Sequence, residues 1–264
     1  MEALITAGVD LGSTYVKAAV VRDWERIGYG VAPTGNDHDV TSHRVLAEAL
    51  DMGGVKRDEI DYIVSTGYGR RVTSLANETI SEISANARGV QWLGAELGVR
   101  TIIDIGGQDT KVISLDDKLE MINFAMNDKC AAGTGRFLEV LARVLDVPLS
   151  EMGPLSLKSK DPVDITTTCL VFAKSEVANL IFQGYPKEDI IMGIHKAVAR
   201  RLVAMAKKVG VRKVVFFDGG PARNIGMVRA MERELGMEMY VPDMPQIVTA
   251  TGAAVLAAEK LNGK

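Results

Sequence analysis

Short apolar runs alternate with glycine-rich polar turns along the chain. Three such runs near the start predict three strands, and three runs further on repeat the arrangement. The six ranges are 4–9, 15–21, 26–32, 101–105, 111–115 and 119–124. A repeated unit of strand, acidic glycine turn, strand and strand predicts two similar lobes that face a central cleft.

Between and after these runs, other segments have the periodicity of helices with one buried face. Helices are expected at residues 45–50, 81–97, 171–183, 188–209 and 246–261, and one more directly after Cys130. Further strands are expected at 60–65, 164–168, 213–217 and 238–241, and residues 146–162 are expected to be rich in loops. The mixture predicts an α/β protein.

The turn after the first strand of each copy carries an acidic residue and glycine. In the first turn, Gly12 lets backbone approach a phosphate, Ser13 and Thr14 supply donors, and Asp10 can hold a hydrated Mg²⁺. The second turn spans residues 104–110. One such turn is often an ordinary hairpin turn, but two in one cleft predict a clamp on a metal-bound polyphosphate.

Two other glycine-rich segments follow strands. Gly219 and Gly220 come between a strand and a helix, where a ribose or a flat ring can pass close to backbone. Residues 66–71 form a sharp loop near a cleft or a partner, for which a structural and a functional role are both open. His195 lies beside an apolar helical stripe and is expected to be packed or at the surface rather than a ligand.

The two cysteines occupy related positions. Cys130 and Cys169 each precede a predicted helix, where free N–H groups and the positive end of the helix dipole favour a thiolate. In the second helix, Val171, Phe172, Val177 and Leu180 are expected on the buried face. The hypothesis is a thiolate ligand at each of two helix starts.

Composition narrows the class of function. Hydrophobic residues make up 47% of the 264 residues, so the chain can form a sizeable core. A net charge of −3 gives no support for binding to nucleic acid or to an anionic membrane. Two cysteines do not make a disulfide framework, and a cytoplasmic location is expected.

The three glycine turns, in this order, resemble those of the actin/Hsp70/sugar-kinase superfamily of ATPases. The resemblance assigns residues 10–14 and 104–110 to two phosphate loops and 218–224 to an adenosine loop. It implies a two-lobed, hexokinase-like fold in which duplicated ribonuclease-H-like lobes, each a mixed sheet flanked by helices, hold ATP between them. Lobe I would comprise residues 1–98 and 246–264, and lobe II residues 99–245.

The cysteine segments narrow the resemblance to one family. Residues 66–70, 104–111, 127–137 and 168–176 are similar to motifs of the activator ATPases of 2-hydroxyacyl-CoA dehydratases and of the ATPase subunits of benzoyl-CoA reductases. This implies a homodimer sharing one [4Fe–4S] cluster, with Cys130 and Cys169 from each subunit. The count agrees, because such a cluster takes four thiolates and one chain has two.

The resemblance also implies a function and a set of roles. A reduced ferredoxin or flavodoxin would load the cluster, and ATP hydrolysis would drive a low-potential electron to an iron–sulfur dehydratase. Asp10 and Asp104 would organise Mg²⁺ and water, and Gln108 or Asp109 would orient the attacking water. The expected nucleotide contacts are Gly12, Ser13, Thr14, Lys17, Gly106 and Gly107 for the phosphates and Gly219, Gly220 and Asn224 for the nucleoside.

Three alternatives stay open on the sequence alone. The chain could serve a benzoyl-CoA-type or a double-cubane-cluster reductase instead of a dehydratase. It could be a small-molecule kinase of the same fold, which would need a catalytic base and no iron. It could also be an ATP-binding regulator without catalytic activity.

Overall fold

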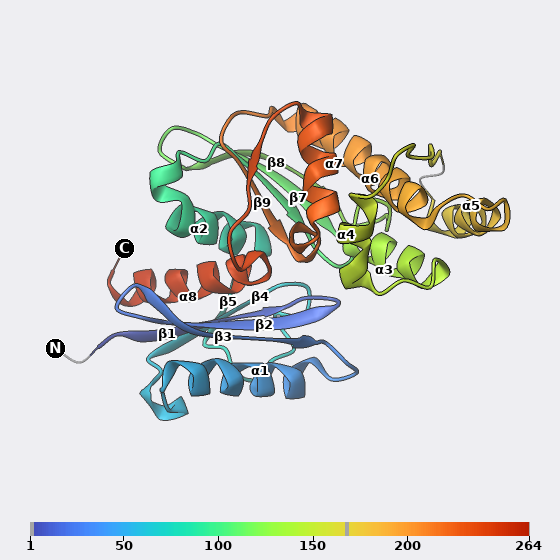
Figure 1. The fold of residues 1–264 in the computed structure, drawn as a ribbon. Coiled ribbons are helices and arrows are strands. Elements are labelled where there is room, and N and C mark those ends of the chain that lie inside the picture. The colour runs from blue at the N-terminus through green and yellow to red at the C-terminus, as the bar shows by residue number, and fades with distance from the viewer. Residues whose placement is uncertain (1–2, 167–168, 264) are drawn as a thin grey trace. The chain divides into compact units, whose positions relative to one another are not determined.

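A computed structural model describes residues 3–166 and 169–263 of the chain. The chain divides into two compact units (Figure 1). Unit 1 comprises residues 1–99 and 246–264, and unit 2 comprises residues 100–245. The C-terminal helix therefore belongs to the same unit as the N-terminal strand.

Unit 1 is built on a five-stranded mixed sheet in the order β3-β2-β1-β4-β5. The central strand β1 pairs antiparallel with β2 and parallel with β4. Every residue of β1 is buried, because helices cover both faces of the sheet (Figure 1). The strands are β1 (Ile5–Leu11), β2 (Tyr15–Arg22), β3 (Glu25–Pro33), β4 (Tyr62–Thr66) and β5 (Glu78–Thr79).

Three helices complete unit 1: α1 (His38–Gly53), α2 (Glu82–Gly94) and α8 (Val248–Leu261). Helix α1 packs on β2 and β3, whereas α8 packs on β1 and β4 and against α2. Small residues permit the close approach of α8, since a side chain at Gly8 would meet the backbone of Ala250 and Ala254. The alanine-rich sequence of α8 thus fits its place directly on the sheet.

Unit 2 repeats this sheet. Its order is β8-β7-β6-β9-β10, with β6 antiparallel to β7 and parallel to β9. Strand β6 corresponds to β1, and β9 corresponds to β4. The strands are β6 (Thr101–Ile105), β7 (Thr110–Leu115), β8 (Met121–Asn127), β9 (Val215–Gly219) and β10 (Met239–Tyr240).

The helices of unit 2 surround one large apolar core with the sheet. Phe137, Leu141, Ile194, Leu202 and Phe217 are among its buried members. The long helix α6 packs on α7 and α4, and α3 packs on α5. The helices are α3 (Gly135–Val144), α4 (Met152–Ser156), α5 (Leu170–Phe182), α6 (Lys187–Val209) and α7 (Ile225–Leu235).

The predicted α/β class with two mixed sheets is confirmed, and three local features differ from the predictions. Within residues 146–162, which were predicted to be rich in loops, residues 149–156 form a short 3₁₀ turn and helix α4 that the sequence did not predict. Residues 164–166 lie outside any strand, and the rest of that predicted strand, 167–168, lies outside the described residues. Among helices in the described ranges, none has the length and apolarity needed to cross a membrane.

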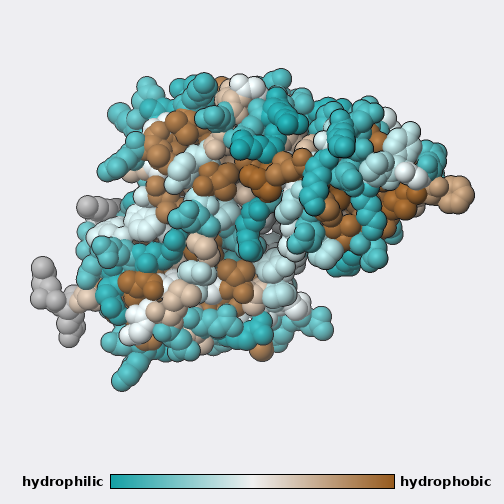
Figure 2. All heavy atoms as spheres, in the orientation of Figure 1, coloured by the Kyte–Doolittle hydropathy of each residue, from teal (hydrophilic) through white to brown (hydrophobic). Residues whose placement is uncertain are grey.

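The third difference concerns the buried face of α5. Val171 and Phe172 are 69% and 66% exposed, whereas Val177 is buried as predicted, together with Ala173, which was not predicted. Helix α5 packs through Ala173 and Val177, so its neighbours in sequence point outward. Apolar side chains are correspondingly visible at the surface of this part of unit 2, at the right of the view in Figure 2.

Candidate functional site

The turn between β1 and β2 is the predicted first phosphate loop. Asp10 and Lys17 stand opposite each other in the strand register, and Lys17 Nζ lies 2.8 Å from Asp10 Oδ2. The hydroxyl of Thr34, the residue after β3, donates to the Gly12 carbonyl at 2.8 Å and holds the turn in place. The hydroxyls of Ser13 and Thr14 make no hydrogen bond within residues 3–166 and 169–263, so both can donate to an anion.

The second phosphate loop has the same place between β6 and β7. Asp104 and Lys111 stand opposite each other, and Lys111 Nζ lies 3.2 Å from Asp104 Oδ2 and also pairs with Asp109. The Gly106 N–H donates to the Asp109 carbonyl at 2.9 Å, which closes the turn. Gln108 is exposed at its tip. Lys111 thus forms ion pairs with two carboxylates, whereas Lys17 forms an ion pair with one.

The second loop is joined directly to the segment that carries Cys130. The Gly135 N–H donates to the Gly106 carbonyl at 2.9 Å, and the Arg136 N–H donates to the Gly107 carbonyl at 2.8 Å. These donors are the first two residues of α3. A shift of the phosphate loop would therefore act on the start of α3 through two backbone hydrogen bonds.

The predicted adenosine loop follows β9. Gly219 ends that strand, and Gly220 opens the short 3₁₀ turn that leads to α7. The Asn224 side chain caps α7 by accepting from the Met227 N–H at 3.1 Å. Its amide nitrogen also lies 3.2 Å from His195 Nε2. The predicted contact of Asn224 with a nucleoside stays a prediction.

His195, on α6, is fully buried, which agrees with the prediction of a packed residue. Burial lowers the pKa of its ring from 6.5 to about 3. Its Nε2 lies 3.2 Å from Asn224 Nδ2, and a neutral ring accepts a hydrogen bond there. Nδ1 has no hydrogen-bond partner among the described residues. His195 therefore supports the residue that caps α7.

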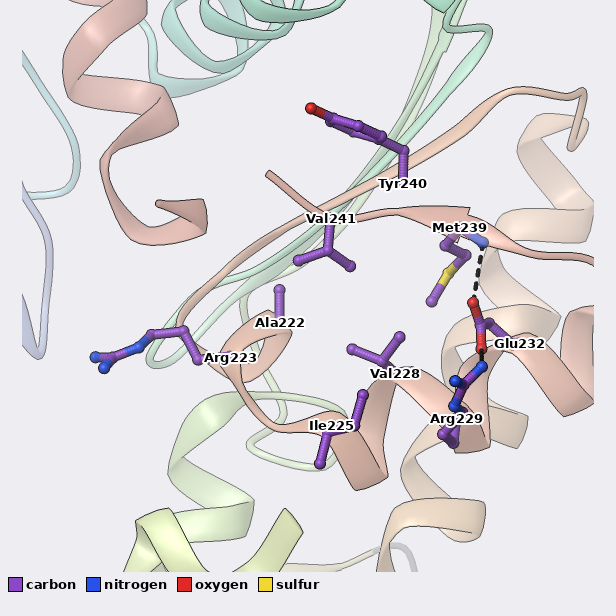
Figure 3. A pocket seen from close by; sticks show the side chains of 9 residues that line it. All are labelled: Ala222, Arg223, Ile225, Val228, Arg229, Glu232, Met239, Tyr240 and Val241. Carbon is purple, nitrogen blue, oxygen red and sulfur yellow. Dashed lines mark hydrogen bonds and ion pairs between the residues drawn. The ribbon is translucent and has the colours of Figure 1, made fainter. Parts of the chain in front are cut away.

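A pocket of about 430 Å³ lies beside the adenosine loop, between α7 and β10 (Figure 3). Ala222, Val228 and Val241 point into it, whereas the Arg223 side chain extends away. Glu232 closes one side, paired with Arg229 at 2.9 Å and accepting from the Met239 N–H at 3.3 Å. The lining is mostly apolar with a charged rim, which suits a flat ring.

Both cysteines are free, Cys130 half-buried and Cys169 exposed. Cys169 is the N-cap of α5, as expected. Cys130 is not at the start of α3, because the turn at residues 131–134 intervenes and the first N–H groups of α3 bond to the phosphate loop. Its carbonyl instead accepts from the Asn127 side chain at 2.8 Å. In the described part of the chain, no three His, Cys, Asp or Glu residues group to hold a metal ion.

Sequence reasoning missed a role for Lys111, Thr34 and Gly67. Lys111 had a signal, since it follows Asp104 by seven residues as Lys17 follows Asp10. Gly67 also had a signal, because residues 66–71 are predicted to form a sharp glycine loop, but its approach to Asp10 was not predicted. Thr34 had none of comparable strength, because its contact joins segments that only the folded sheet brings together.

Paired five-stranded mixed sheets, with an Asp-x-Gly turn after the first strand of each, define the class of actin- and sugar-kinase-like ATPases. A glucokinase of the ROK family from Streptomyces griseus shares this fold at a TM-score of 0.59 and 14% identity, covering 97% of this chain and 99% of that one. Residues 7–257 match the model of the BadF/BadG/BcrA/BcrD ATPase family, and the chain belongs to that family.

The relatives agree with the predicted family. The chain is 45% identical to the 2-hydroxyisocaproyl-CoA dehydratase activator of Clostridioides difficile, over 97% of this chain and 96% of that protein. It is 40% identical to the (R)-2-hydroxyglutaryl-CoA dehydratase activating ATPase of Acidaminococcus fermentans, over 97% and 98%. It is 31% identical to one of the subunits of the benzoyl-CoA reductase of Thauera aromatica, over 96% and 93%.

A solved structure extends this agreement to the fold. The activator of the 2-hydroxyisocaproyl-CoA dehydratase from Clostridium difficile, with bound ADPNP, superimposes at a TM-score of 0.94 with 44% identity. The match covers 98% of this chain and 96% of that one. The predictions of the family and of an ATPase are confirmed.

Proposed function

We propose that this protein is an ATP-dependent activator that passes a low-potential electron to a 2-hydroxyacyl-CoA dehydratase. The observation that carries the proposal is the pair of hydrogen bonds from Gly135 and Arg136 to the carbonyls of Gly106 and Gly107. These two hydrogen bonds join the second phosphate loop to the start of α3, and Cys130 lies only five residues before α3 in the chain. A kinase of the same fold has no need of such a route.

Cys130 and Cys169 would hold a [4Fe–4S] cluster together with the same two residues of a second copy. The donors suit this group, since both thiols are free, neither is fully buried, and they precede two helices, α3 and α5, that pack on each other. A homodimer would also cover exposed apolar side chains on β8 and α5. These are Met121, Ile122, Phe124 and Met126 on β8 and Val171 and Phe172 on α5.

The loops would bind ATP with Mg²⁺. Ser13, Thr14 and Lys17 supply donors, and the backbone of Gly12, Gly106 and Gly107 permits close approach of the phosphates. The carboxylates of Asp10 and Asp104, each oriented by a lysine at Oδ2, would hold the hydrated metal. Gln108, exposed and without a hydrogen bond in the described residues, or Asp109 would orient the attacking water.

The base would lie beside Gly219 and Gly220, in the pocket between α7 and β10. Hydrolysis yields ADP and inorganic phosphate, and the relaxation of the second loop would reach Cys130 through α3. The cluster, when bound, supplies a one-electron redox centre.

A ferredoxin or flavodoxin in the cytoplasm would be the electron donor. A dehydratase is the preferred acceptor over a benzoyl-CoA-type reductase, because identity to dehydratase activators is 40–45% and to the reductase component 31%.

Iron content of the anaerobically purified protein tests the proposal. We expect brown protein with about four iron atoms per dimer, and loss of that iron in Cys130→Ala and in Cys169→Ala. Lys129→Ala, beside Cys130 and exposed, is the matched control and should keep its iron. Nucleotide binding should persist in all three variants. Colourless protein that retains ATP hydrolysis and phosphorylates a small molecule would overturn the electron-donor function.

A further inference from the structure

The two sheets correspond beyond their phosphate loops. Strand β4 lies beside β1 and pairs Thr66 with Asp10, whereas β9 lies beside β6 and pairs Asp218 with Asp104. The next residue along is glycine in both cases, Gly67 in unit 1 and Gly219 in unit 2. Gly67 therefore occupies in unit 1 the place that the first glycine of the adenosine loop occupies in unit 2.

The two glycines share a backbone conformation and a neighbour. Their φ angles are +88° for Gly67 and +84° for Gly219, in the left-handed region that favours glycine. A Cβ at Gly219 would lie 2.7 Å from Asp104 Oδ1, and a Cβ at Gly67 would lie under 3.0 Å from Asp10 Oδ1. Real Cβ atoms essentially never come so close.

Each aspartate is therefore confined from two sides. Asp10 Oδ2 is held by Lys17 at 2.8 Å, and Asp10 Oδ1 faces the bare Cα of Gly67. Asp104 has the same arrangement with Lys111 on Oδ2 and Gly219 near Oδ1. A side chain at position 67 would turn the carboxylate of Asp10 and strain its pairing with Lys17.

The loop that carries Gly67 is fixed onto the first phosphate loop. The Gly69 N–H donates to the Leu11 carbonyl at 2.8 Å, and the Ser65 hydroxyl donates to the Arg70 carbonyl at 2.7 Å. Arg70 Nη1 donates back to the Gly67 carbonyl at 3.1 Å. These bonds hold Gly67 in place. A Cβ at position 67 would also lie 2.8 Å from the carbonyl carbon and oxygen of Leu11, so the Asp10 carboxylate and the neighbouring backbone of the first loop would have to move together.

We propose that the loop Thr66–Arg70 is a positioning element of the ATP-hydrolysing site, with Gly67 as the residue that orients Asp10. The inference rests on the proposed role of Asp10 in holding hydrated Mg²⁺. It gives the sharp glycine loop a function that its sequence left open, and it makes that loop the unit 1 counterpart of the adenosine loop.

The test compares Gly67→Ala with Gly54→Ala in the full-length protein. Gly54 has a similar φ of +62° but nothing within 4 Å of its Cβ position, so Gly54→Ala measures the backbone cost alone. We expect Gly67→Ala to lower kcat for ATP hydrolysis by about tenfold or more, because a small misplacement of a reacting group is costly. The Mg²⁺ concentration for half-maximal ADPNP binding should rise, whereas Gly54→Ala should leave both quantities unchanged.

Asp10→Asn separates this inference from the proposed function. If Asp10→Asn leaves ATP hydrolysis intact, the proposed role of Asp10 is wrong. If Asp10→Asn abolishes activity while folded Gly67→Ala keeps kcat within about twofold and an unchanged Mg²⁺ requirement, the positioning role of Gly67 is wrong. The double variant gives a further test. If Gly67→Ala changes Mg²⁺ binding by the same factor in Asp10→Asn as in the unaltered protein, the positioning role of Gly67 is also wrong.

A third variant covers the case in which Gly67→Ala does not fold. Gly69 has an ordinary φ, and its Cβ would press on the movable His38 ring at 2.8 Å and on Leu11 Cβ at 3.2 Å. Gly69→Ala should therefore fold and shift the same loop away from Leu11. We expect a smaller change in kcat and Mg²⁺ requirement in the same direction, and unchanged values would contradict the proposal.

Discussion

The two phosphate loops share a plan but differ in what they are joined to. Each is an Asp-x-Gly turn with a lysine opposite the aspartate. The first is held by a hydrogen bond from Thr34, which follows β3 of the same unit, and its Lys17 is 18% exposed. The second has Lys111 at 4% exposure between two carboxylates and bonds to the start of α3. Under the proposed function, the first loop would only hold ligand, whereas the second would also transmit its state to α3.

The largest expected effect concerns the two lysines. Lys111→Met should lower the free energy of unfolding by about 3 kcal/mol, because it removes a nearly buried ammonium group that contacts both Asp104, which is also nearly buried, and Asp109, which is partly exposed. Lys17→Met should cost about 1 kcal/mol or less, because Asp10 and Lys17 form a single pair with partial access to water. Urea unfolding of both variants measures the difference. Equal losses would show that the loops do not differ in their electrostatics.

Buried His195 gives unit 2 a sensitivity to acid. The unfolded chain binds a proton near pH 6.5, the ordinary pKa of the ring, whereas the folded pKa is about 3. The unfolded state therefore holds more protons between these values, and stability falls as pH falls. At pH 5 this costs about 2 kcal/mol relative to pH 7.

His195→Gln should remove that part of the pH dependence while still offering an acceptor to Asn224. His43→Gln in unit 1 is the control, since His43 is exposed. Urea unfolding from pH 7 to pH 5 compares the three proteins. An unchanged slope in His195→Gln would mean that the ring is not the group that titrates on unfolding.

Much of this architecture could be predicted from local sequence. Strand β1, its Asp10–Thr14 turn and their repetition in unit 2 follow from local pattern, because alternation of strand and glycine turn is encoded within a few residues. Contacts across strands did not follow from local pattern. The exposure of Phe172 depends on which face of α5 the core accepts, and the occupation of the Asn224 amide depends on a histidine in another helix. Such contacts are decided by tertiary packing.

The smallest expected loss of stability comes from two threonine variants, which test whether the first loop binds ATP and the second loop transmits its state to α3. Thr34→Val removes the hydroxyl that donates to the Gly12 carbonyl at 2.8 Å, and Thr110→Val removes the one that donates to the Gly133 carbonyl at 2.6 Å. Each should cost about 1 kcal/mol of stability. Thr34→Val should raise the KM for ATP several-fold with an unchanged number of electrons transferred per ATP, because only the first loop loosens.

Thr110→Val should lower the number of electrons transferred per ATP and leave the KM for ATP nearly unchanged, since Gly133 lies between Cys130 and α3. Its KM for ATP should stay within about twofold, because the first loop keeps its hydrogen bond from Thr34, while fewer electrons reach the acceptor for each ATP hydrolysed. Steady-state hydrolysis and anaerobic electron transfer, measured on the same preparations, give both numbers. If both variants change only the KM for ATP, the second loop does not transmit the state of the nucleotide to α3. The two loops would then differ only in the ion pairs of their lysines.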